Sequence, residues 1–237
     1  MKTVFLTAAA LAVSAVAVPA FAQGNEWTNP QTYLNGAYVE ATGGSTFQGA
    51  TTQFSSSQGG QYPGTAKDSG HIRPGWFGSA LVGHKLAPGL SVEAEGVYIA
   101  GNFNHATEAA QGVGGDSRTY GGFGNVRFSI PYDYKISRFA LVPYIAGGIG
   151  YGDIRTRLSG SDNYLNTDQS GFMWQGKAGI EIKTGTPVSF DLGYRYIQAP
   201  DVDGRSNNGG ATAGIASSSF EQKSHMQAAT FGVKYTF

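Results

Sequence analysis

The 237-residue chain contains no cysteine, which excludes a disulfide framework, a thiolate metal site, a thiol nucleophile and a lipoprotein-type lipid attachment. It also lacks an excess of either charge: 16 basic residues balance 16 acidic ones, so the chain as a whole has no attraction to nucleic acid. Its four histidines are scattered without metal-ligand spacing, and we expect no metal and no cofactor. After the N-terminal segment, no stretch approaches the roughly 18 apolar residues of a transmembrane helix.

The N-terminal segment is typical of an export signal. Lys2 precedes a largely apolar run from Val4 to Val18, and Pro19 is followed by the small-residue pattern Ala20-Phe21-Ala22. A membrane-spanning helix would need about 20 apolar residues, and this run is shorter. We therefore expect residues 1–22 to be a signal peptide that the Sec translocon reads and that is removed, leaving residues 23–237 as one domain with a net charge of −1.

The composition and its period favour strands. The chain has 36 glycines, 13 tyrosines and 14 phenylalanines, but only 14% charged residues. In the last segment Ala229, Phe231, Val233, Tyr235 and Phe237 alternate with Ala228, Thr230, Gly232, Lys234 and Thr236. The same apolar and polar alternation runs through the segments Leu90 to Ala100, Tyr120 to Ile130, Trp174 to Lys183 and Val188 to Tyr196. Weaker alternation marks Tyr33 to Gly43, Trp76 to Lys85 and Leu141 to Ile154.

These segments predict an all-β fold, an eight-stranded antiparallel up-and-down transmembrane β-barrel, because each strand has about the ten residues that a tilted strand needs to cross a bilayer. The connections alternate between long and short. The long ones run from Ser45 to Gly70, Asn102 to Ser117, Arg155 to Ser170 and Ala199 to Ser224, and the short ones are Ala87-Pro88-Gly89, Pro131 to Arg138 and Gly185-Thr186-Pro187. This pattern fits a barrel with both termini in the periplasm and longer outer loops.

A soluble barrel with its apolar faces turned inward is the alternative reading. The polar faces carry glycines, alanines and isolated charges of both signs, which suits a crowded lumen better than a solvated exterior. Aromatic residues also gather near both predicted ends of the strands, as in the two aromatic girdles of membrane barrels. We therefore favour an integral barrel in a bacterial outer membrane, surrounded by lipid and lipopolysaccharide.

The C-terminal segment carries the most specific motif. Thr230, Gly232, Tyr235 and Phe237 place a polar residue, a glycine and two aromatic residues at fixed positions before the chain end. This pattern, with the alternating strands of the whole mature chain, resembles the small outer-membrane β-barrel superfamily, meaning OmpA-like transmembrane domains and opacity-type "porin family" surface proteins. The resemblance implies that these four residues form an assembly signal read by the barrel-assembly machinery.

The alternation also predicts a charged lumen. Its members are Glu40, Glu93, Glu95, Arg127, Lys177, Glu181, Asp191, Arg195 and Lys234, with Ala37, Val39 and Ala41 facing outward beside Glu40. An eight-stranded barrel is only wide enough for side chains to fill, so paired charges there favour a stabilising network. The alternative is a narrow ion path that opens when the pairs rearrange.

No reaction is predicted. A lipid A acyl-modifying enzyme would need a serine, a histidine and an acid near the outer rim, and the candidates Ser224-His225 and Asp116-Ser117 sit in no recognisable nucleophile motif. The long connections are rich in Ser, Thr, Gly, Gln and Asn, which reads as flexible surface with room for an extracellular ligand. We expect a non-enzymatic envelope protein with a structural and surface-contact role, with a narrow porin-like channel as the alternative.

Overall fold

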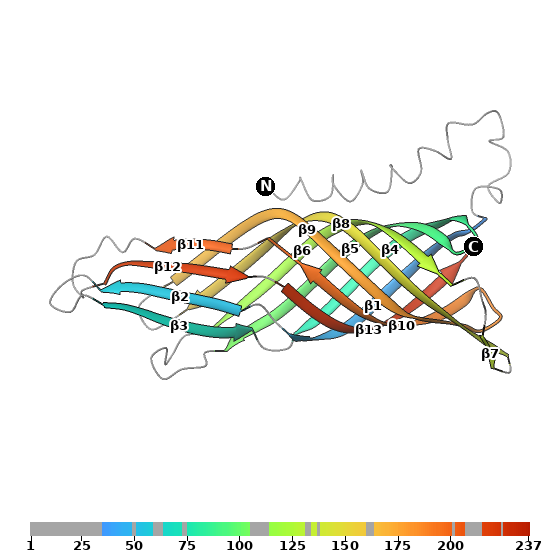
Figure 1. Ribbon diagram of the computed structural model, residues 1–237, viewed down its shortest axis with the longest axis horizontal. Helices are drawn as coiled ribbons and strands as arrows, with labels where there is room; N and C mark the ends of the chain where they lie inside the picture. The colour runs from blue at the N-terminus through green and yellow to red at the C-terminus, as the bar shows by residue number, and fades with distance from the viewer. Residues whose placement is uncertain are drawn as a thin grey trace, which may run out of the picture.

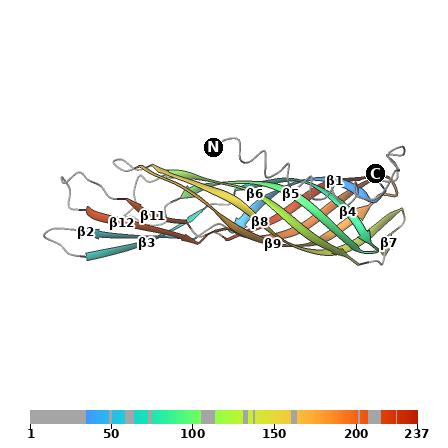
Figure 2. The same ribbon diagram turned by 90° about the horizontal axis from the view of Figure 1, so that it is seen from above.

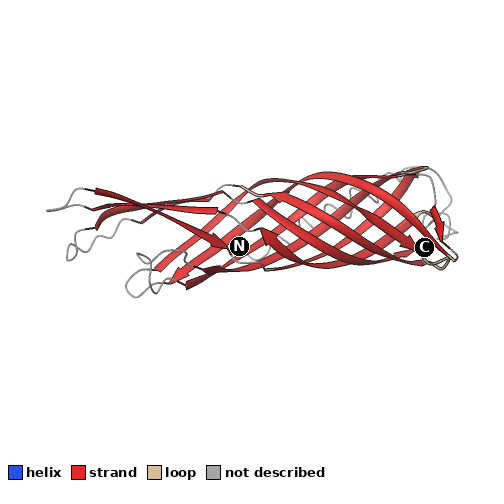
Figure 3. Ribbon diagram, turned by 60° about the horizontal axis from the view of Figure 1, so that its bottom comes forward, coloured by secondary structure: helices blue, strands red, loops and turns tan. Residues whose placement is uncertain are grey.

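A computed structural model of the chain describes residues 35–48, 51–58, 64–72, 75–104, 114–130, 134–136, 138–159, 164–200, 202–206, 215–223 and 225–237. These residues form strands and turns without a helix, as Figure 3 shows. No helix in the described part is long and apolar enough to cross a membrane. The predicted signal peptide, residues 1–22, lies outside the described residues.

Eight antiparallel strands close into a barrel (Figure 1). In chain order they are β1 (Ala37–Gln48), β4 (Trp76–Ala87), β5 (Leu90–Asn104), β6 (Gly114–Ser129), β8 (Phe139–Ser159), β9 (Tyr164–Lys183), β10 (Val188–Gln198) and β13 (His225–Thr236). Pairing of β5 with β6 completes the circle β5-β4-β1-β13-β10-β9-β8-β6. The predicted eight-stranded antiparallel barrel is confirmed.

Short turns join the strands at the end of the barrel where β1 begins and β13 ends, here called the turn end. Gly89 and Gly185 adopt φ values of 80° and 77°, a left-handed conformation that glycine accepts without strain, and they turn the chain between β4 and β5 and between β9 and β10. Between β6 and β8 the short strand β7 (Tyr134–Ile136) pairs with the start of β8. Phe237 donates its backbone N–H to the oxygen of Ala37 over 3.0 Å, which ties the chain end to the first barrel strand.

Beyond the opposite end of the barrel, four further strands form a projection. They are β2 (Thr51–Gln58), β3 (Gly64–Ile72), β11 (Val202–Ser206) and β12 (Ile215–Lys223), paired in the order β11-β12-β2-β3. Figures 1 and 2 show this projection continuing past the barrel along its long axis. It pairs with β5 only through His71 with Asn104 and Ile72 with Phe103.

The expectation that the long connections are loops is therefore wrong in part. The segments Ser45 to Gly70 and Ala199 to Ser224 contain the projecting strands, and β5, β6, β8 and β9 extend past their predicted ends. Antiparallel pairing satisfies backbone groups whatever the side chains are, so a polar Ser- and Thr-rich segment continues a ladder that an apolar segment has begun.

The outside of the barrel is apolar. Exposed positions alternate with buried ones along each barrel strand, and they include Ile145, Ile149, Phe172, Leu192 and Phe231. Val39 is exposed while Tyr38 and Glu40 are buried, which confirms the predicted facing of the first strand. Aromatic side chains lie near both ends of the described barrel, with Trp76, Tyr151 and Trp174 toward the projection and Tyr134, Phe139, Tyr235 and Phe237 at the turn end. Two aromatic belts around an apolar band are typical of a wall that faces lipid.

Candidate functional site: the interior of the barrel

Charged side chains fill the half of the interior near the turn end. They are Glu40 on β1, Glu93 and Glu95 on β5, Arg127 on β6, Lys177 and Glu181 on β9, Asp191 and Arg195 on β10 and Lys234 on β13, and all are buried. The alternation of the strands brings them together, because inward positions of neighbouring strands meet at the same level. Here we call these residues the charge network.

Arg127 is the centre of the network at the turn end. Its guanidinium contacts Glu181 at 2.8 Å, Asp191 at 3.4 Å and Glu40 at 3.5 Å, and Glu93 lies at 3.8 Å. The same group lies 3.6 Å from the centre of the Tyr144 ring. One buried cation thus holds carboxylates from four strands.

Two lysines link this centre to the rest of the network. Lys234 on β13 donates to Glu181 over 2.8 Å and lies 4.0 Å from the centre of the Tyr38 ring. Lys177 on β9 donates to Glu93 over 2.7 Å and to Glu95 over 3.3 Å. Every buried carboxylate of the network therefore has a cation within ion-pair distance, which offsets the cost of removing it from water.

Glu95 is the centre of the network's other part. Arg195 donates to it over 2.7 Å, and the amides of Asn125 and Gln175 each donate over 2.9 Å. Gln175 also accepts from Arg195 over 3.0 Å and donates to the oxygen of Asn125 over 2.7 Å. These neutral partners were missed from the sequence, although Asn125 and Gln175 share the inward phase of Arg127 and Lys177.

Tyrosines complete the network, and glycines make room for them. The Tyr38 hydroxyl donates to Glu93 over 2.9 Å and the Tyr144 hydroxyl donates to Asp191 over 2.7 Å. A Cβ at Gly83 would collide with the Tyr38 ring, and a Cβ at Gly179 would lie 2.8 Å from the Tyr144 hydroxyl. The inward glycines therefore provide the space that large side chains of the neighbouring strands occupy.

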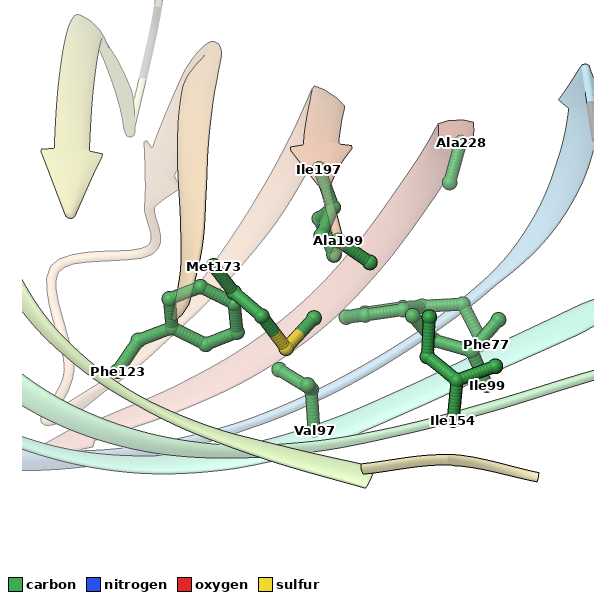
Figure 4. Packing of buried hydrophobic residues seen from close by; sticks show 9 residues of the cluster. All are labelled: Phe77, Val97, Ile99, Phe123, Ile154, Met173, Ile197, Ala199 and Ala228. Carbon is green, nitrogen blue, oxygen red and sulfur yellow. The ribbon is translucent and has the colours of Figure 1, made fainter. Parts of the chain in front are cut away.

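An apolar cluster fills the interior between the network and the projection, and the sequence analysis did not predict it. Its members, labelled in Figure 4, are Phe77, Val97, Ile99, Phe123, Ile154, Met173, Ile197, Ala199 and Ala228, with Met226 packed against them. The two regions meet where the Arg195 guanidinium lies 4.4 Å from the centre of the Phe77 ring. Adjacent apolar residues such as Val97 and Tyr98 mark strand ends that are apolar on both faces, and this signal could have revealed the cluster.

The residues of the predicted assembly signal divide between the two faces of β13. Thr230 and Gly232 face the interior, where a Cβ at Gly232 would lie 3.0 Å from the Thr42 hydroxyl. Tyr235 and Phe237 are exposed on the outside, with their ring centres 5.1 Å apart. The aromatic pair is therefore open to contact at the seam where β13 meets β1.

Among the candidates for an enzymatic site, the described residues His225, Asp116 and Ser117 each contact other partners. Ser224 lies outside the described residues, and His225 stacks on Tyr196 with ring centres 6.4 Å apart. Ser117 is buried and lies 3.3 Å from the Thr156 hydroxyl, while its neighbour Asp116 pairs with Arg118 at 3.0 Å. Among the described residues, no group of His, Asp and Glu side chains could hold a metal ion.

A closed barrel with an apolar, aromatic-belted outside and a buried network of paired charges is the architecture of a transmembrane β-barrel. The chain belongs to the outer membrane protein beta-barrel domain family, whose model matches residues 8–237. It is an integral protein of the bacterial outer membrane.

The name of a curated relative agrees with this family. A curated protein named "Outer membrane protein" from Gluconacetobacter diazotrophicus is 30% identical over 203 residues, which are 79% of this chain and 53% of that relative. The chain thus spans about half the length of the curated relative it matches.

A solved structure shows the same fold. OprG, an outer membrane protein from Pseudomonas aeruginosa, matches with a TM-score of 0.58 and 12% identity over 86% of this chain and 97% of OprG. Neisserial surface protein A is also similar, at 17% identity over 86% of this chain and 98% of its own, with a TM-score of 0.45.

Proposed function

We propose that this protein is a sealed, non-enzymatic barrel that contributes to envelope structure and presents its projecting strands for contact at the cell surface. The observation that carries the proposal is the filling of the barrel interior. Paired charges occupy one half, and the apolar cluster occupies the other. An ion crossing the barrel would have to displace buried ion pairs and then enter an apolar layer, and both steps are costly.

The competing function is a narrow ion channel, which the charges of both signs along the interior would line. Planar-bilayer recording on protein extracted from membranes distinguishes a sealed barrel from an ion channel. We expect conductance no higher than that of bilayers without protein. Reproducible single-channel steps would overturn the sealed-barrel proposal and establish the channel.

We assign the turn end, with the N- and C-termini, to the periplasm and the projection to the cell exterior. The support is the asymmetry of the connections, since outer-membrane barrels keep short turns on the periplasmic side. Protease added to intact cells should cut within the long connections and leave a C-terminal tag after Phe237 intact. Tag removal in intact cells, with the outer membrane unbroken, would reverse the orientation.

The placement of the described candidate residues supports a barrel without catalysis. Ser117 faces the interior beside Thr156, whereas Asp116 lies on the outer face with Arg118. Mass spectra of lipid A from cells with and without the protein should be identical. A change in acylation that depends on the protein would establish an enzyme.

A further inference from the structure

A row of neighbouring aromatic side chains crosses the outer surface near the projection. Trp76 on β4 and Tyr98 on β5 have ring centres 4.8 Å apart, and Tyr98 and Tyr120 on β6 are 4.9 Å apart. The row continues onto β8, where the Arg155 guanidinium lies 6.0 Å from the centre of the Tyr120 ring. This row of three aromatic rings therefore ends beside a cation.

Two more arginines extend the cationic edge. Arg118 on β6 lies directly opposite Arg155 in the β6–β8 register, and Arg157 is two residues further along the same exposed face of β8. Like charges directly opposite each other in neighbouring strands are destabilising. Asp168 lies directly opposite Arg155 and Asp116 lies directly opposite Arg157 in the register, so carboxylates hold the three arginines together on one face.

Aspartates contact this edge but engage only part of it. Asp116 lies 3.0 Å from Nε of Arg118, and Asp168 lies 3.6 Å from Nε of Arg155. The carboxylate of the third aspartate, Asp153, accepts a hydrogen bond from Ser170. Within the described residues, the ion-pair contacts of Arg118 and Arg155 are made by Nε, and a guanidinium carries further N–H donors on its terminal nitrogens.

We propose that this face, made of Trp76, Tyr98, Tyr120, Arg118, Arg155 and Arg157, binds the phosphorylated sugar headgroup of lipid A in the outer leaflet. Guanidinium groups match phosphate with paired charge-assisted hydrogen bonds, and flat aromatic rings stack on the apolar faces of sugar rings. The face lies where the aromatic belt meets the headgroup layer. The proposal rests on the orientation given above, with the projection outside the cell.

The barrel offers a matched control at its other end. Arg138 is also exposed and also lies over an aromatic ring, 5.4 Å from the centre of Phe139, but it belongs to the turn end. Under the proposed orientation Arg138 faces the phospholipid leaflet. It has the same side-chain chemistry, but the contact joins one arginine to one ring, whereas the proposed face has three arginines beside a row of three.

The test is native mass spectrometry of detergent-extracted protein titrated with bisphosphorylated lipid A, monophosphorylated lipid A or phosphatidylglycerol. We expect the triple variant R118Q/R155Q/R157Q to bind bisphosphorylated lipid A about tenfold more weakly than the parent protein, which corresponds to about 1.4 kcal/mol. R138Q should bind like the parent. Heat-modifiable gel migration of every variant verifies that the barrel is folded.

Three outcomes would overturn the proposal. They are unchanged lipid A binding by the folded triple variant, parent binding to phosphatidylglycerol as tight as to lipid A, and a tenfold loss in R138Q with none in the triple variant. Lipid binding and conductance are measured in separate experiments. A loss of the lipid A proposal therefore leaves the sealed-barrel proposal standing, and observed conductance would leave the lipid A proposal standing.

Discussion

At the scale of single residues, Arg127 is the cation on which most buried carboxylates converge. Glu40, Glu93, Glu181 and Asp191 lie within 3.8 Å of its guanidinium, and the ring of Tyr144 covers one face. Removing one partner from a buried ion pair leaves a charge with neither water nor a counter-ion, which costs more than the pair itself contributes. The network is therefore most sensitive at Arg127.

Arg127→Met should destabilise the barrel strongly. Methionine fills part of the volume but leaves the carboxylates of Asp191 and Glu40 without a cation at ion-pair distance among the described residues. We expect the free energy of unfolding to fall by roughly 3–5 kcal/mol. Urea unfolding in lipid vesicles, followed by gel migration of unheated samples, measures this change.

The matched control is Arg155→Met, whose ion pair with Asp168 is exposed to solvent. Its cost should stay within about 1 kcal/mol because exposed ion pairs contribute little. Equal shifts of the urea midpoint in the two variants would show that the buried pairs do not carry the stability assigned to them.

Gly83→Ala tests the fit between β4 and β1. The added Cβ would collide with the Tyr38 ring, so the ring or the strand must move, and we expect a loss of about 1–3 kcal/mol. Gly124→Ala is the control, because a Cβ there meets nothing within 4 Å. In the same urea assay, the double variant Gly83→Ala/Tyr38→Ala should lose less than the two single variants together. Strict additivity would contradict the collision.

At the scale of elements, period-two alternation predicted the strands and their facing where one face is apolar and the other polar. β10 and β13 follow this pattern along most of their length, so Asp191, Arg195 and Lys234 were placed inward from sequence alone. The pattern fails where both faces are apolar, as at Val97 beside Tyr98, and the apolar cluster was missed for that reason. It also fails for the projection, whose polar strands depend on backbone pairing.

The terminal strand β13 carries the predicted assembly signal, which deletion of Phe237 tests. The ring of Phe237 is exposed at the seam between the first and last barrel strands, so an assembly factor can reach it. We expect the deletion to lower the amount of heat-modifiable barrel in outer membranes by more than Phe231→Leu does. Phe231 is a suitable control because it is an exposed aromatic residue on the same face of β13.

Immunoblots of unheated membrane fractions measure this difference. Purified protein without Phe237 should still fold in detergent, which separates an assembly defect from a loss of stability. Equal barrel levels for the two variants in cells would count against the signal.

At the scale of the whole molecule, the barrel and the projection are joined by few pairings. All eight barrel strands pair with one another through β1, β4, β5, β6, β8, β9, β10 and β13, without a contribution from β2, β3, β11 or β12. Among the described residues, the strand pairing between the projection and the barrel consists of His71 with Asn104 and Ile72 with Phe103, and β11 also lies near β9. Stability should therefore reside in the barrel, and surface contact in the projection.

This division predicts that the barrel folds without the projection. Replacing residues 49–74 and 201–224 with short Gly-Ser turns retains every barrel strand, as well as Ala199 of the apolar cluster. We expect the shortened protein to remain heat-modifiable and to unfold within about 1 kcal/mol of the parent, since surface changes away from the core have small effects. Deleting β5 and β6 is the control, because these are also consecutive strands but belong to the barrel wall, and that chain should not migrate as a folded barrel. A shortened protein that fails to fold would mean that the projecting strands hold the barrel closed, and the sealed wall would then extend into the projection.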